Sequence, residues 1–238
     1  MNTEAFADIH QHVLWGMDDG PNSPGQMQQL LAQDVQNGIT LLCATAHACP
    51  GVRPFDFEQY RLRLREANAC CAARGWDLRI LPGCEILYCD SVPDHLSDGR
   101  LPSLGNSRYV LIEFQPDVPL SRIGKAAADL YRRGYQPVLA HVERYRCLVR
   151  RPGRAMAARE EYGLVYQMNC PTVLQPGSPW KRRFVEQLLG AQAIDAVATD
   201  AHDSIRRPVQ MAEAYARLSR EYGQDYARRL VTWGKALV

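Results

Sequence analysis

Several features that mark common protein classes are absent from this sequence. No apolar run approaches the roughly 18 residues needed to cross a bilayer, and residues 1–4 carry no basic, apolar signal pattern. The formal net charge is only +2, too close to balance to indicate a nucleic-acid partner. We therefore expect a cytoplasmic protein with no membrane span and no nucleic-acid partner.

The eight cysteines indicate neither disulfides nor cysteine chemistry. They form no Cys-x-x-Cys pair, and a chain of 238 residues with 46% hydrophobic residues can bury a substantial core without cross-links. No cysteine is followed by arginine six residues later, so the Cys-x5-Arg phosphate loop is absent. We expect free thiols and a reaction without a cysteine nucleophile.

Strand and helix patterns alternate along the chain. Apolar strands are predicted at 5–7, 39–45, 78–81, 109–113, 137–140, 164–169 and 194–199. Helices are predicted at 23–37, 56–75, 121–133 and 178–190, with a last pair after Pro208, and Ser23, Ser121 and Ser178 are the expected caps. Because no linker or change of composition interrupts this alternation, we predict one α/β domain, 1–238, with a parallel sheet.

Two histidines, His10 and His12, follow the first apolar run. Side chains alternate along a strand, so residues two apart emerge on the same side and could hold one metal ion. A single His-x-His is weak evidence, because two hydrogen-bonded loop histidines would give the same pattern.

The recurrence of such residues strengthens the metal hypothesis. Histidines and carboxylates also end later apolar runs, and an acidic turn follows the first strand. The candidate ligands are His10, His12, Asp19, His47, Glu85, Glu113, His141, Asp200 and His202. Imidazole and carboxylate together suit Mn, Fe or Zn. Nine candidates exceed the needs of one ion, so we expect two or three ions that share a carboxylate and hydrolyse a phosphoester through a bridging hydroxide.

The distribution of these candidates also bears on the shape of the sheet. An open doubly wound sheet would fit the number of strands, but its outer strands could not all reach one ion cluster. In a barrel every strand delivers its carboxyl end to the same mouth. The candidates follow six different strands, which favours a barrel.

Other polar residues have two readings. We expect Asp8 to hydrogen-bond its loop and Asp18 to form the turn that precedes the ligand Asp19. Glu143 is either a group that orients a metal-bound histidine or a solvated loop carboxylate. The basic cluster either attracts an acidic phosphopeptide or is merely solvated. Its members are Arg144, Arg146, Arg150, Arg151 and Arg154.

Seven short motifs together carry a resemblance to a known family. In chain order they are Asp8-Ile9-His10-Gln11-His12, Gly16-Met17-Asp18-Asp19-Gly20, Ala44-Thr45-Ala46-His47, Leu81-Pro82-Gly83-Cys84-Glu85, Leu111-Ile112-Glu113-Phe114, Ala140-His141-Val142-Glu143-Arg144 and Thr199-Asp200-Ala201-His202. This set, spread over about residues 8–218, resembles the polymerase and histidinol phosphatase (PHP) superfamily. It resembles more narrowly the bacterial manganese-dependent protein-tyrosine phosphatases that regulate capsular polysaccharide.

The resemblance implies a distorted seven-stranded (β/α) barrel with three metal ions. It assigns one ion to His10, His12, Glu85 and Asp200, a second to Glu85, Glu113 and His141, and a third to Asp19, His47 and His202. It also implies that Arg144 and Arg207 hold the phosphoryl group, although Arg206 is adjacent and could take the second role. Ala46 and Val142 stand where the family commonly has proline, so the loops at the mouth are expected to differ.

The predicted function is hydrolysis of phosphotyrosine in a protein, with Mn as the expected metal and Fe or Zn as alternatives. The resemblance implies that the substrate is the tail of a bacterial tyrosine autokinase in capsular or exopolysaccharide biosynthesis. The alternatives are a histidinol-phosphate or other small-molecule phosphatase, a nuclease, and an inactive metal-binding barrel. A barrel amidohydrolase with a modified lysine is disfavoured, because Lys125, Lys181 and Lys235 end no predicted strand.

Overall fold

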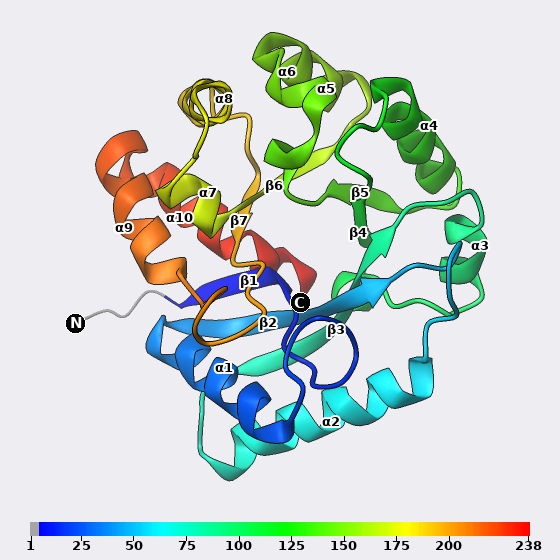
Figure 1. Cartoon of the computed structure of the whole chain (residues 1–238), viewed down its shortest axis with the longest axis vertical. Helices are drawn as coiled ribbons and strands as arrows, with labels where there is room; N and C mark the ends of the chain where they lie inside the picture. Colours follow the sequence, from blue (N-terminus) through cyan, green and yellow to red (C-terminus); the bar gives the residue numbers. More distant parts are fainter. Residues whose placement is uncertain (1–4) are drawn as a thin grey trace.

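The predicted apolar runs form a sheet of seven parallel strands in the computed structural model, which describes residues 5–238 (Figure 1). The strands neighbour one another in chain order. Their bounds are β1 Phe6–Gln11, β2 Ile39–Ala48, β3 Arg79–Leu87, β4 Tyr109–Glu113, β5 Gln136–Leu139, β6 Val165–Asn169 and β7 Ala196–Ala198. Residues 1–4, for which the sequence predicted no signal pattern, lie outside the described residues.

The sheet closes into a barrel where its first and last strands meet. The His12 amide donates to the Ala201 carbonyl over 3.0 Å, and the Asp200 amide donates to the His10 carbonyl over 2.8 Å. Gln11 and Ala201 form a parallel bridge between the same two segments. The α/β barrel predicted from the sequence is confirmed, and the open doubly wound sheet is wrong.

Helices lie around the outside of the strands (Figure 1). The longer ones are α1 Pro24–Gln36, α2 Phe57–Ala73, α4 Leu120–Tyr131, α6 Pro152–Glu161, α8 Pro179–Gly190, α9 Met211–Tyr222 and α10 Gln224–Thr232. The short ones are α3 Val92–Ser97, α5 Arg146–Val149 and α7 Cys170–Leu174, together with the 3-10 turns η1 Leu104–Asn106, η2 Val142–Arg144 and η3 Trp233–Leu237. None of the helices within residues 5–238 is both long enough and apolar enough to cross a bilayer.

Local sequence explains several helix starts. Ser23 and Ser178 cap α1 and α8, each accepting a hydrogen bond from the amide three residues on. The predicted cap Ser121 is wrong: α4 begins one residue earlier, after Pro119, without a side-chain cap. The polar helix α6 was not delineated from the sequence, because it buries only Pro152, Ala155 and Ala158 and so gives little apolar periodicity.

The amino ends of the strands are filled by apolar side chains. Alternate strand residues such as Leu41, Leu81 and Leu111 form an interior cluster, to which Leu104 of η1 and Leu237 of η3 contribute. The other strand faces pack against the helices in a larger cluster. Since apolar residues fill one end of the barrel interior, polar side chains gather at the carboxyl ends.

Candidate metal centre

The strand alternation carries the candidate ligands into the barrel mouth. In β3 the interior residue Leu81 is four positions before Glu85, and in β4 Leu111 is two positions before Glu113, so both carboxylates continue the interior face. In β1 the strand register is irregular between Asp8 and Gln11, a type of distortion that redirects side chains.

The deepest group consists of His10, His12, Glu85 and Asp200, all of them buried. One ligand atom from each lies within 4.8 Å of the others. The Nε2 atoms of His10 and His12 are both 3.2 Å from Glu85 Oε2. This is the set that the resemblance assigned to one ion.

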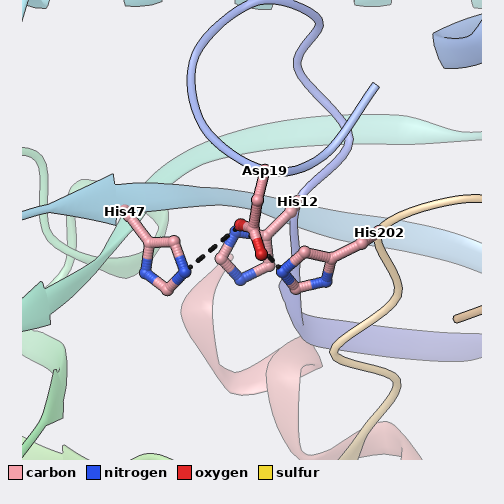
Figure 2. A group of neighbouring side chains, drawn as sticks. All are labelled: His12, Asp19, His47 and His202. Carbon is pink, nitrogen blue, oxygen red and sulfur yellow. Dashed lines mark ion pairs between the residues drawn. The ribbon is translucent and has the colours of Figure 1, made fainter. Parts of the chain in front are cut away.

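A second group opens to solvent and contains His12, Asp19, His47 and His202. Figure 2 shows Asp19 between the rings of His47 and His202. Asp19 Oδ1 is 3.4 Å from His47 Nε2 and 3.2 Å from His202 Nε2, while the Asp19 side chain is 61% exposed. The geometry therefore adds the shared His12 to the three residues predicted for this ion.

A third group joins His47 to Glu85 and Glu113. His141, predicted for this ion, lies beside it: its Nε2 is 2.6 Å from Glu85 Oε1 and 3.6 Å from Glu113 Oε2. Glu85 thus contacts four histidines from three different strand ends, as the predicted bridging carboxylate would. All nine predicted ligands lie in these three groups or against them.

The unsatisfied atoms of the site fit cations. His47 Nδ1 and His202 Nε2 are buried and make no hydrogen bond within the described residues, although carboxylate oxygens lie 3.1 and 3.2 Å away. Nitrogen and oxygen donors that point to a common position, and not at each other, are typical of metal ligands. The donor set of five histidines and four carboxylates is chemically suited to divalent first-row ions.

The charges of the cluster are strongly coupled. Burial alone would raise the pKa of Glu85, but the charge of His10 and hydrogen bonds from His10, His12 and His141 hold it well below its ordinary value. Burial opposes protonation of His12, yet the Asp18 carboxylate raises its pKa to about 10. Bound cations would supply positive charge to balance the carboxylates gathered in the mouth.

Two arginines border the cluster at Asp200. The Arg144 guanidinium is 2.5 Å from Asp200 Oδ2, and that of Arg207 is 3.0 Å from the same oxygen. Arg207 also approaches Asp19 at 3.5 Å, whereas Arg206 is 89% exposed and pairs with Asp203. Arg144, Arg206 and Arg207 all contribute to the lining of a hollow of about 230 Å³ beside Asp200.

Sequence reasoning missed the amide side chains of β6. Gln167 Oε1 lies 3.1 Å from His10 Nδ1 and accepts a hydrogen bond of 2.7 Å from the His141 amide. Its amide nitrogen donates to Asn169, whose own amide donates to Asp200 over 2.6 Å. This network fixes the orientation of three candidate ligands. The sequence feature that could have pointed to this network is the pair of amide side chains, Gln167 and Asn169, in an otherwise apolar strand.

The other polar residues have defined positions. Asp8 lies inside β1 and accepts hydrogen bonds from the amides of His10 and Thr199, so it holds the backbone. Asp18 accepts from the Gly20 amide, as a turn-former would, and also holds His12 Nδ1 at 2.7 Å. Glu143 is buried and accepts from the Asn169 amide, so its reading as a solvated carboxylate is wrong.

Comparisons with known proteins agree with this geometry. The family model described as "Capsular polysaccharide synthesis, CpsB/CapC" matches residues 6–236. The chain is 30% identical to the tyrosine-protein phosphatase CpsB of Streptococcus pneumoniae over 230 residues, which is 94% of this chain and 93% of that protein.

Solved structures are similar at two levels. One, from crystals of YwqE from Bacillus subtilis and CpsB from Streptococcus pneumoniae described as unique metal-dependent tyrosine phosphatases, gives a TM-score of 0.87 at 30% identity, covering 97% of this chain and 93% of that one. The histidinol phosphate phosphatase of Lactococcus lactis gives a TM-score of 0.59 at 14% identity, with 92% and 94% covered, and shares the fold alone.

Proposed function

Because the chain belongs to the capsular polysaccharide synthesis CpsB/CapC family, we propose that it is a metal-dependent protein-tyrosine phosphatase. The family and the barrel type predicted from the sequence motifs are thereby confirmed. The observation that carries the activity is the position of Glu85, which two of the three groups of metal-type donors share, within reach of two arginines on Asp200.

The proposal assigns two to three divalent ions to the nine residues, with manganese first and iron or zinc as alternatives. Glu85 would bridge, with His10, His12 and Asp200 on its buried side and His47, Glu113 and His141 on the other. Bound cations would supply Lewis acidity that activates water at neutral pH and offsets phosphoryl charge. The geometry that supports this assignment is the convergence of ligand atoms within 4.8 Å in each group.

The chain's own residues have separate tasks in this proposal. Arg144 and Arg207 would each offer a guanidinium fork to the phosphoryl oxygens, which stabilises charge that builds up during transfer. Asp18 and Gln167 hold the rings of His12 and His10, so that their Nε2 atoms face Glu85. Neither Cys84 nor Cys170 is a ready nucleophile, since burial raises the pKa of both thiols well above the ordinary value.

We further propose that the substrate is a bacterial tyrosine autokinase of the capsular or exopolysaccharide system. The protein would encounter this kinase in the cytoplasm, and residues 1–238 would act as a single domain. The exposed Asp19 supports a protein substrate, because the outer donor group reaches the surface where a tyrosine side chain projecting from a polypeptide can approach.

The test compares kcat/KM for a phosphotyrosine peptide with kcat/KM for histidinol phosphate. The phosphotyrosine peptide should be preferred by at least about tenfold, equivalent to about 1.4 kcal/mol. Asp200→Ala should abolish both activities, while the exposed control Asp77→Asn should retain them. A preference for histidinol phosphate would contradict the proposed protein substrate. An active Asp200→Ala variant would contradict the proposed location of the active site.

A further inference from the structure

A second basic feature lies outside the metal centre, in a hollow of about 480 Å³ between the start of α4 and the α5–α6 segment. Figure 1 shows these helices beside one another on the rim of the barrel. Four arginines contribute to the lining of the hollow, and no carboxylate does so in the described part of the chain. They are Arg146, Arg150, Arg151 and Arg154.

These arginines differ from most others in the protein. Arg122, Arg132 and Arg159 each pair with a carboxylate, whereas no ion pair involves any of the four within residues 5–238. All four are exposed. Four like charges that share one hollow repel one another, so an anionic partner would relieve the repulsion.

The start of α4 adds to the positive potential of the hollow. This helix has 12 residues, its N-cap Pro119 provides no side-chain acceptor, and its first turn has no acidic residue. The positive end of the helix dipole therefore meets no acidic residue in the first turn, where Leu120 and Ser121 line the hollow.

Chain connectivity places the hollow next to the metal centre. The loop after β4 leads from Glu113 to Pro119, and the loop after β5 leads from His141 through Arg144 to Arg146. The Arg146 amide donates to the Pro116 carbonyl over 2.9 Å and joins the two loops. Two residues of chain span at most about 7 Å, so the Cα atom of Arg146 lies within that distance of the Cα atom of Arg144.

We propose that this hollow binds acidic side chains of the protein substrate on one side of its phosphotyrosine. The inference rests on the proposed function and adds a preference for carboxylates near the phosphorylated residue. A polypeptide fits better than a lipid surface, since the exposed large apolar residues of the described chain, such as Trp180 and Ile205, are not among those lining the hollow. A membrane-binding patch would carry such residues for insertion.

The test uses two phosphotyrosine peptides that differ only in flanking residues, glutamate in one and glutamine in the other. Wild-type protein should hydrolyse the glutamate peptide with a KM about three- to tenfold lower, and this advantage should shrink as salt is raised. Arg150→Gln combined with Arg154→Gln should remove the advantage while leaving kcat and the hydrolysis of p-nitrophenyl phosphate unchanged. The Arg150→Lys, Arg154→Lys variant should keep most of the KM advantage for the glutamate peptide.

The matched control is Arg65→Gln with Arg79→Gln, which makes the same charge change on α2 and at the amino end of β3. It should keep the preference for glutamate. Equal KM values for the two peptides in wild-type protein, or an equal loss of preference in the control, would overturn the proposal.

A binding measurement separates this inference from the proposed function. The unphosphorylated glutamate peptide, labelled with a fluorophore, should bind wild-type protein more tightly than the Arg150→Gln, Arg154→Gln variant, by the same three- to tenfold factor. If neither phosphopeptide is hydrolysed but this difference in peptide binding is found, the proposed phosphatase function is wrong and the proposed binding role of the hollow is supported. If instead the variant loses binding only to phosphatidylglycerol vesicles, the hollow is a membrane contact and the proposal is wrong.

Discussion

At the residue scale, the site depends on polar groups whose partners come from distant parts of the sequence. Gln167 is the clearest case, because it contacts His10 and the His141 amide, 157 and 26 residues away. Its role follows from position: an amide in the barrel interior can serve one histidine ring and one backbone amide together.

A second buried polar pair gives a prediction for stability. Asp34 of α1 accepts a hydrogen bond of 2.7 Å from Gln11, and both residues keep one oxygen without a partner in the described structure. Burial raises the pKa of Asp34 well above its ordinary value. A protonated Asp34 has a hydrogen to donate, and Gln11 has an oxygen that lacks a donor.

The raised pKa means that folded Asp34 holds its proton more tightly than unfolded Asp34 does. Its contribution to stability is therefore complete below the ordinary pKa of about 4 and is lost as pH rises toward the folded value, at about 1.4 kcal/mol per pH unit. Asp34→Asn should gain stability relative to wild type as pH rises above the ordinary pKa of about 4, as measured by urea unfolding. The exposed control Asp77→Asn should not, and parallel pH profiles for wild type and Asp34→Asn would refute the assignment.

At the element scale, the strands point their carboxyl ends at the site while short turns fill the opposite end. The η3 turn packs so closely on β1 that a Cβ on Gly234 would lie 2.6 Å from Ile9 Cγ2 and 3.1 Å from Ala7 Cβ. Only glycine allows this approach. The turn therefore closes the barrel beneath the strand that carries His10 and His12.

Gly234→Ala should destabilise the protein by about 1–3 kcal/mol, because the added methyl group must displace β1 or η3. The control is Gly190→Ala at the end of α8, where an added Cβ meets nothing within 4 Å. Denaturant midpoints measure both. An unchanged midpoint for Gly234→Ala would show that the turn can move away from β1 without cost.

At the scale of the whole molecule, the barrel brings together four carboxylates that repel one another unless cations or protons balance them. Metal should therefore bind the folded protein only, and saturation at about a thousand times Kd would add about 4 kcal/mol to its stability.

Chelation should lower the unfolding temperature by roughly 5–15 °C and abolish phosphatase activity, and manganese should restore both. Metal analysis of the purified protein should find two to three equivalents, while His202→Ala should contain less. Full activity in metal-free protein would end the proposed mechanism.

The sequence by itself determined the seven strands, the longer helices apart from α6, and the types of donor at the strand ends, because these depend on local periodicity, on capping and on motif spacing. Glu85, His141 and Asp200 could be chosen on that basis as candidates. Local sequence patterns do not show which of these residues lie close together in space.

The resemblance supplied a division of the donors among three ions, but only the tertiary structure decided that His12 and His47 each belong to two groups, and that Arg207 pairs with Asp200 while Arg206 pairs with Asp203. It also revealed the roles of the amides of β6, and it placed four arginines of the basic cluster named from the sequence beside the start of α4. These features arise from closure of the barrel, since contacts between residues far apart in the chain depend on how strands are staggered around a ring, which no local pattern records.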